Sequence, residues 1–275
     1  MSKPIHPDEW LMSAKSLPVG QTRRVRHGRE SRSNMVISNK PDRYTAYCHA
    51  CQRGGIVLKE HAYLGKLPEP EPLEVPTDLI PVHEHVGAMT FLASKNIPML
   101  PTYTNGLLFS PSRRRIIINT PQGVLGRHIG SSPAKWITYN KQTYASVGYA
   151  TPDAQMVVIT EDTLSAWKTG IVATELGLRV QMFAALGSQI STQLMLRLLA
   201  EYSGVPIIVW SDGDKGGEKF RDRWAQQVRA MNLLGGSYIP AKNYDPKDYP
   251  IITVAEILKS MAAYKFEPGR AYGLL

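Results

Sequence analysis

The chain has 275 residues, of which 43% are hydrophobic and 20% are charged, so composition excludes wholesale disorder and allows one large domain or a few small ones. No apolar run approaches the ~18 residues that a membrane-spanning helix needs. The first ten residues lack the apolar core of a secretory signal. We therefore expect no membrane partner and a cytoplasmic location.

The net charge of +9 is distributed unevenly along the chain. Residues 1–66 carry twelve Lys/Arg against five Asp/Glu, and residues 67–84 carry five acids and no Lys/Arg. Residues 85–150 carry seven Lys/Arg and no acid, whereas residues 151–275 carry thirteen of each. Because a solvated face normally mixes both signs, the acid-free stretch suggests a surface that faces a polyanion. A chance run of charge is the alternative.

The first 66 residues are expected to form a small β-rich module. Two short strands are predicted at 34–38 and 44–47, on either side of a turn that contains a proline. Cys48 and Cys51 follow, at a spacing more typical of metal or redox chemistry than of a structural disulfide. Because a module of this size buries little apolar surface, a bound metal would stabilise it.

Four prolines between residues 67 and 76 predict an extended, semi-rigid linker over residues 67–84. Residues 85–150 then begin with a predicted helix at 88–95 and continue as a compact, mostly β unit. Its strands are predicted at 106–110, 114–119, 124–129 and 136–139.

Strands and helices alternate from residue 156 to the end of the chain. This pattern predicts an α/β fold with a parallel sheet that helices cover on both faces, after α+β parts at the N-terminus. The strands are predicted at 156–159, 180–184, 206–210 and 237–239, and the helices at 163–169, 188–202, 218–231 and 254–261.

Acidic residues follow three of these strands. Glu161 follows the first strand, Asp212 and Asp214 follow the third, and Asp245 and Asp248 lie in the loop after the fourth. Since sites in a parallel sheet form at the carboxyl ends of the strands, the five carboxylates are expected to share one edge. Carboxylate oxygens are ligands for Mg²⁺. Asp212 and Asp214 could instead cap a helix and close a turn.

Three segments together resemble the TOPRIM domain of DnaG-type primases, topoisomerases and some nucleases, over about residues 154–262. They are T-E-D-T-L-S-A at 160–166, I-I-V-W-S-D-G-D-K-G-G at 207–217 and K-N-Y-D-P-K-D at 242–248. One departure is Asp162, where the family usually has glycine; it could alter the loop or add a ligand.

The resemblance implies a catalytic role for Glu161, Asp212 and Asp214. These three would hold Mg²⁺ or Mn²⁺, with Asp245 and Asp248 completing the metal site.

The segment before it is similar to the N-terminal polymerase subdomain of primases. R-R-I-I-I at 114–118 leads through a turn to Gly126 and Arg127, and K-W-I-T-Y follows at 135–139. The resemblance implies that Arg127 and Lys135 face nucleotide phosphates or the template, where a cation would neutralise charge on a phosphoryl group. The alternative is that both are solvated surface cations.

The N-terminal module is similar to half of a primase zinc ribbon. Its second Cys-x-x-Cys is intact at Cys48 and Cys51 and is followed by two glycines. The first half falls on residues 24–27, where His27 can bind Zn²⁺ and Arg24 cannot. Structural zinc takes four ligands, so His49 or His6 could supply the fourth. Alternatively, the ribbon has lost its metal and persists as a basic module.

The order of the three modules resembles a phage or bacterial DNA primase, specifically the primase half of short-tailed phage primase-helicases. The resemblance implies synthesis of short RNA primers from ribonucleoside triphosphates on single-stranded DNA, in the host cytoplasm if a phage encodes the chain. No P-loop pattern is present, so a separate replicative helicase is the expected partner. The alternatives are a degenerate primase that only binds DNA or a helicase, and a TOPRIM nuclease or topoisomerase-like enzyme. The DNA backbone is expected to meet Arg113, Arg114, Arg115, Arg23, Arg24 and Arg26.

Overall fold

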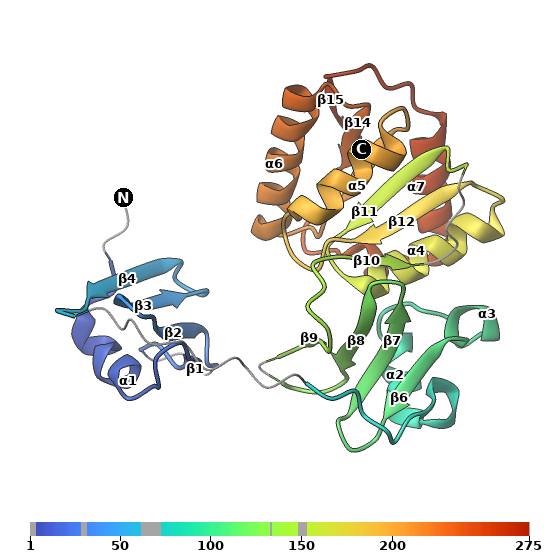
Figure 1. Ribbon diagram of the computed structural model, residues 1–275. Helices are drawn as coiled ribbons and strands as arrows, with labels where there is room; N and C mark the ends of the chain where they lie inside the picture. Colours follow the sequence, from blue (N-terminus) through green and yellow to red (C-terminus); the bar gives the residue numbers. More distant parts are fainter. Residues whose placement is uncertain (1–3, 29–31, 62–72, 133, 148–152, 275) are drawn as a thin grey trace. The chain divides into compact units, whose positions relative to one another are not determined.

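The chain divides into two compact units, a smaller one of residues 1–72 and a larger one of residues 73–275 (Figure 1). The predicted linker spans this division, and its residues 67–72 lie outside the described part of the chain. The computed structural model describes residues 4–28, 32–61, 73–132, 134–147 and 153–274.

The smaller unit is an antiparallel sheet packed against a short helix, α1 (Leu11–Lys15), with a 3₁₀ turn at Pro7–Glu9 before it. Trp10, Met35 and Ile37 lie in its core. The structure contains both predicted strands, as β2 and β3; β1, β4 and α1 were not predicted. The strands follow in sheet order as β1 (Thr22–Val25), β2 (Met35–Asn39), β3 (Arg43–Cys48) and β4 (Arg53–Leu58).

The larger unit begins with a five-stranded sheet whose neighbouring strands are all antiparallel. The four predicted strands of this region are present, with bounds that differ by at most one residue. In sheet order the strands are β5 (Ile80–Pro81), β6 (Leu107–Ser110), β7 (Arg115–Thr120), β8 (Gly123–His128) and β9 (Trp136–Thr138). A 3₁₀ turn and two helices accompany them: η2 (Val82–Glu84), α2 (Val86–Ala93) and α3 (Pro101–Thr104).

A six-stranded sheet forms the rest of the larger unit. All its neighbouring strands are parallel except β10, which pairs antiparallel with β12 and was not predicted. Its order is β10 (Ala145–Val147), β12 (Val180–Ala184), β11 (Met156–Thr160), β13 (Ile207–Trp210), β14 (Gly235–Tyr238) and β15 (Ala271–Leu274). The boundary predicted between residues 150 and 151 falls in the segment 148–152, outside the described residues.

Helices cover both faces of this sheet, as predicted (Figure 1). Successive residues of β11 alternate between two cores, since Met156 and Val158 pack with α4 and α7, whereas Val157 and Ile159 pack with α5 and α6. The predicted start of α5 at Ser188 is wrong, because Ser191 caps that helix. The helical elements are α4 (Thr163–Glu175), α5 (Thr192–Tyr202), α6 (Lys215–Met231), η3 (Pro246–Asp248) and α7 (Ile251–Ala263).

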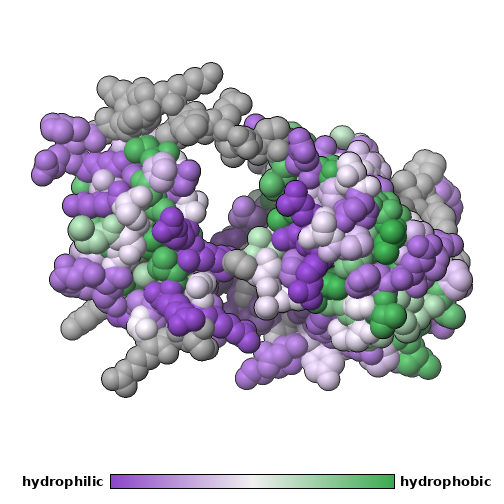
Figure 2. Space-filling model, turned by 90° about the horizontal axis from the view of Figure 1, so that it is seen from below, coloured by the Kyte–Doolittle hydropathy of each residue, from purple (hydrophilic) through white to green (hydrophobic). Residues whose placement is uncertain are grey.

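No helix in the described part of the chain is long and apolar enough to cross a membrane. On the face that Figure 2 shows, hydrophobic residues form separate small patches among hydrophilic ones. Scattered exposed apolar side chains of this kind are normal for a folded domain.

Candidate active site

Two neighbouring parallel strands, β11 and β13, bring the first acidic residues together. The strand order reverses between them, because β12 lies on one side of β11 and β13 on the other. Ligand sites in such sheets lie at this kind of reversal, outside the carboxyl ends of the strands. Glu161 follows β11 directly, and its Oε1 accepts a hydrogen bond of 3.0 Å from the backbone N–H of Asp212 after β13.

Asp162 adds a carboxylate to this edge. Its Oδ1 accepts hydrogen bonds from the backbone N–H groups of Leu164 (2.9 Å) and Ser165 (3.1 Å), and it thereby caps α4. Its Oδ2 lies 2.7 Å from the Nζ of Lys247. Asp162, where the TOPRIM pattern usually has glycine, therefore both caps α4 and adds a carboxylate beside Glu161 and Asp212.

The loop that carries Asp245 and Lys247 is held against β13 and α4. Gly213 donates to the carbonyl of Tyr244 at 2.8 Å, and a Cβ on Gly213 would lie 2.2 Å from the carbonyl oxygen of Ala241. The buried Lys168 of α4 donates to the carbonyls of Lys247 (2.9 Å) and Tyr249. Glycine is required at 213 because this loop approaches so closely.

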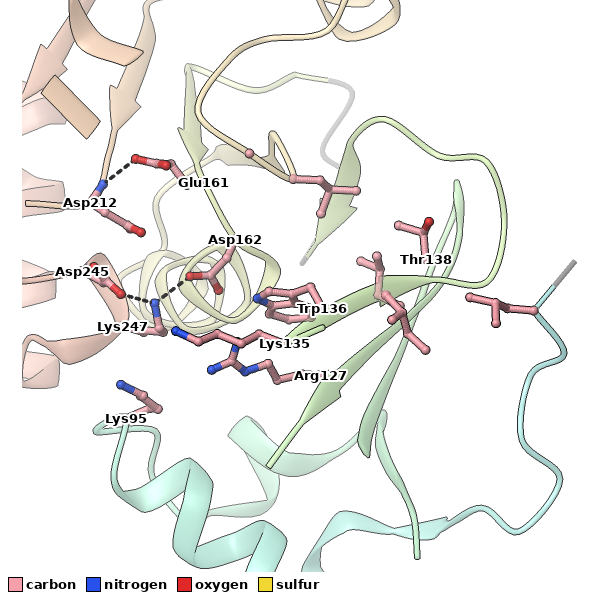
Figure 3. Close-up of a pocket in the computed structure, with 15 residues that line it drawn as sticks. Lys95, Arg127, Lys135, Trp136, Thr138, Glu161, Asp162, Asp212, Asp245 and Lys247 are labelled. Atoms are coloured by element: carbon pink, nitrogen blue, oxygen red, sulfur yellow. Dashed lines mark hydrogen bonds and ion pairs between the residues drawn. The ribbon is translucent and has the colours of Figure 1, made fainter. Parts of the chain in front are cut away.

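A cavity of about 660 Å³ opens beside these acids (Figure 3). One wall is acidic and belongs to the six-stranded sheet and its loops. The opposite wall is basic and comes from β8, the residue before β9 and the turn after α2, whose cationic side chains point toward the acids in Figure 3. Among the charged lining residues are Glu161, Asp162, Asp212, Asp245 and Lys247 on the first wall and Lys95, Arg127 and Lys135 on the second.

Arg127 is held in place by two aromatic rings. Its guanidinium carbon lies 5.4 Å from the ring centroid of Phe91 and 5.5 Å from that of Trp136. Burial lowers the pKa of Arg127, and the charges of Asp162 and Asp245 oppose that shift. Its Nε is buried without a hydrogen-bond partner among the described residues. The structure thus presents a fixed cation at the cavity, as the phosphate-binding prediction requires.

Two of the predicted metal ligands, Asp214 and Asp248, do not line the cavity. Asp214 accepts a 2.9 Å hydrogen bond from Gly217 N–H and caps α6, which was the alternative reading of this residue. Asp248 pairs with Lys95 at 3.2 Å. The role of Asp214 and Asp248 as ligands stays a prediction. The charge of Asp214 does raise the pKa of Glu161.

The side chains of Glu161 and Asp212 fit a divalent cation. Burial raises the pKa of Glu161 to about 7, although the Asp212 N–H opposes this; the charges of Asp214 and Asp245 raise it further. Burial raises the pKa of Asp212 as well. Asp212 Oδ1 is buried with no hydrogen-bond partner in the described chain. Buried carboxylates without a counter-charge are stabilised by a bound cation, and oxygen ligands suit Mg²⁺ or Mn²⁺.

In the smaller unit, the three predicted zinc ligands come together. The ligand atoms of His27, Cys48 and Cys51 all lie within 4.8 Å of one another. His27 Nδ1 is 3.5 Å from the sulfur of Cys51. A hydrogen bond from Arg53 lowers the pKa of Cys51 to about 7, which favours the thiolate that binds metal.

The fourth zinc ligand is not supplied by either predicted histidine. Neither His6 nor His49 belongs to the described three-residue group. On the far side of His27, Nε2 lies 2.9 Å from the Oε2 of Glu9. A carboxylate on the second ring nitrogen is the arrangement that orients histidine ligands in metal sites. Three of the four donors that a structural zinc ion takes are therefore together in the described part of the chain, with one supporting carboxylate.

The predicted DNA contact at Arg115 is wrong. Arg115 is buried, and its guanidinium donates to the backbone carbonyls of Gly126 (3.2 Å), Ala134 (2.9 Å) and Lys135 (3.3 Å). It therefore holds the segment before β9 against β8. The other arginines of the predicted DNA surface are exposed: Arg113, Arg114, Arg23, Arg24 and Arg26.

Sequence reasoning missed three lysines of the site: Lys95, Lys168 and Lys247. Lys247 stands between two of the predicted acids in the K-N-Y-D-P-K-D segment, and this position was a usable signal. Lys95 and Lys168 carry no such signal, because both are distant in sequence from the predicted acids of the last loop: Lys95 lies in the turn after α2 and Lys168 on α4.

No protein-family model and no curated protein matches the chain. Among solved structures, it is similar to the zinc-binding and RNA polymerase domains of Aquifex aeolicus primase, with 14% identity and a TM-score of 0.45 over 93% of this chain and 82% of that one. It is also similar to the RNA polymerase domain of Mycobacterium tuberculosis primase DnaG, with 14% identity and a TM-score of 0.39 over 64% of this chain and 62% of that one.

A third similar structure is the primase fragment of the bacteriophage T7 primase-helicase protein, with 11% identity and a TM-score of 0.36. The match covers 81% of this chain and 94% of that one. Because all three TM-scores are below 0.5, we base the proposal below on the residues of this chain.

Proposed function

We propose that the protein is a DNA primase, which synthesises short RNA primers on single-stranded DNA from ribonucleoside triphosphates. The observation that carries this proposal is the cavity with an acidic wall and a basic wall. Buried acids with an unpartnered oxygen suit a divalent cation, and the cations opposite them, of which Arg127 is held by two rings, suit phosphates. Nucleotidyl transfer needs both.

Each wall of the cavity has its own task. Glu161 and Asp212, with Asp214, would hold Mg²⁺ or Mn²⁺, and Asp245 and Asp248 would support them. When bound, that cation supplies charge neutralisation for the attacking 3′ oxygen and the leaving pyrophosphate. Across the cavity, Arg127 and Lys135 bind phosphates. Because two rings already restrict Arg127, it loses little side-chain entropy on binding.

The smaller unit would contact the template, with Zn²⁺ on His27, Cys48 and Cys51. Zinc supplies a cross-link between β3 and the segment after β1. A separate replicative helicase would supply the single-stranded template.

Incubation of the full chain with single-stranded DNA, labelled ribonucleoside triphosphates and Mg²⁺ tests the proposal. We expect short RNA products from the wild type and none from Asp212→Asn. The matched control, Asp222→Asn, removes an exposed carboxylate of α6 outside the cavity and should leave synthesis intact.

The two alternatives give different results in the same preparations. Nicking of supercoiled plasmid without RNA synthesis would indicate a TOPRIM nuclease. Tight binding of single-stranded DNA without any product would indicate a degenerate primase that only binds DNA.

A further inference from the structure

The ammonium group of Lys247 lies inside the acidic cluster. Its Nζ is 2.7 Å from an oxygen of Asp162 and 2.5 Å from an oxygen of Asp245. Carboxylate oxygens of Asp162, Asp212 and Asp245 lie within 4.8 Å of one another, a geometry that could hold a metal ion. Lys247 itself is only 7% exposed. A cation of the chain thus already occupies this part of the cluster (Figure 3).

The other part of the cluster has no cation of its own. Among the described residues, neither Glu161 nor Asp212 has an ion-pair partner within 4.0 Å. Glu161 receives one backbone hydrogen bond, and Asp212 Oδ1 receives none. The acidic wall is therefore divided into a half that pairs directly with Lys247, at Asp162 and Asp245, and a half without an ion-pair partner, at Glu161 and Asp212, where the charge of Lys247 only partly opposes the rise in the pKa of Asp212 that burial causes.

Lys247 reduces the negative charge that the acidic wall offers to metal ions. Four carboxylates line this wall, and the buried ammonium of Lys247 offsets one of their charges, before the cations of the opposite wall are counted. The three negative charges that remain do not balance two divalent cations. A second ion beside Lys247 would meet the repulsion of a buried ammonium, which is strong where water is excluded.

We propose that Lys247 takes the place of a second metal ion, so that the site holds a single divalent cation on Glu161 and Asp212. Lys247 is a positioning residue, since it acts through Asp162 and Asp245. The inference rests on the proposed function for the reaction that the cation serves.

Counting bound Mn²⁺ by electron paramagnetic resonance tests this inference without nucleotide or DNA. We expect the full chain, freed of metal by a chelator, to bind one Mn²⁺ that Mg²⁺ displaces, and Glu161→Gln to lose it. Lys247→Met should bind a second Mn²⁺, because Asp162 and Asp245 then lack their counter-charge. The control Lys219→Met removes an exposed lysine of α6 that does not line the cavity and should still bind one.

A charge-matched double variant guards against misfolding of Lys247→Met. Asp162→Asn with Lys247→Met keeps the net charge of the wall, and asparagine can still cap α4. We expect it to bind one Mn²⁺. Two ions on the wild type or on this double variant, or one ion on a folded Lys247→Met, would overturn the inference.

Primer synthesis in the same preparations separates this inference from the proposed function. One bound ion without RNA products would support the inference about Lys247 and contradict the proposed polymerase activity. RNA products from a wild type that binds two ions would support the polymerase activity and overturn the inference about Lys247.

Discussion

At Glu161, burial favours the neutral carboxyl group, whereas binding of a metal ion requires the carboxylate. In the absence of metal its pKa rises from 4.5 to about 7, chiefly through burial. Protonated Glu161 therefore contributes stability that is fully present below about pH 4.5 and is lost as the pH rises to about 7. Glu161→Gln does not ionise, so in a chelator it should be more stable than the wild type above pH 7, by on the order of 2 kcal/mol.

Urea unfolding of the full chain at pH 4.5 and pH 8, with a chelator present, measures this difference. The two proteins should have similar stability at the lower pH. Added Mg²⁺ should reverse their order at pH 8, because only the wild type binds it. Glu218→Gln, which changes an exposed carboxylate in the first turn of α6, is the control. A stability difference that does not vary with pH would contradict the assignment.

Glu9 is expected to influence zinc binding through His27 rather than as a ligand. Its carboxylate lies 2.9 Å from His27 Nε2, so it fixes the ring with Nδ1 toward Cys51. Removal of such a carboxylate typically weakens metal affinity about 10- to 100-fold. We expect that loss for Glu9→Gln, measured by competition with a chromophoric zinc chelator. Asp8→Asn, which changes a neighbouring exposed carboxylate, should keep wild-type affinity. Equal affinity in both variants would remove Glu9 from the site.

Among the helices, α4 positions the loop that carries Asp245 and Lys247. Lys168→Met would leave the carbonyls of Lys247 and Tyr249 without their buried donor. An unsatisfied buried polar group costs about 1–3 kcal/mol. We expect a loss of stability of that order together with weaker Mn²⁺ binding, because the loop is no longer held. Lys219→Met, on the exposed face of α6, should change neither. Lower stability with unchanged Mn²⁺ affinity would show that Lys168 has no role in positioning.

The strongly patterned elements of the larger unit were predictable from sequence, short strands such as β6 and β9 included, whereas several elements without such a pattern were not. The runs that became β11, β12 and β13 are buried along their length and apolar apart from Thr160 and Gln181, as buried parallel strands should be. In contrast, β15 contains glycine, carries no such pattern and was not predicted, and of β14 only the second half was predicted, within the strand at 237–239. The helix predicted to end at Thr169 continues past a buried glycine to Glu175, because packing against the sheet outweighs the low helix propensity of glycine.

The position of the candidate site was predictable for a topological reason. Acids at the ends of neighbouring parallel strands must share an edge, which is why Glu161 and Asp212 meet. The sequence could not show which acids are neutralised. That depends on the side-chain positions of Lys247 and Asp214, the first of which pairs with acids and the second of which caps α6.

At the scale of the whole molecule, exposed arginines occur on both units. Arg113 and Arg114 lie in the turn before β7, and Arg24 and Arg26 lie on and after β1. If each contacts one phosphate of single-stranded DNA, each releases counterions, and the slope of log K against log salt changes by about 0.7 per contact.

Arg113→Ala with Arg114→Ala should reduce the slope by about 1.4, equally on oligo(dT) and on mixed sequences. Lys219→Ala with Arg229→Ala on α6 removes the same charge and should leave the slope unchanged. Fluorescence anisotropy at several salt concentrations measures the slope. Equal slopes for the wild type and both double variants would exclude the turn before β7 from the DNA surface.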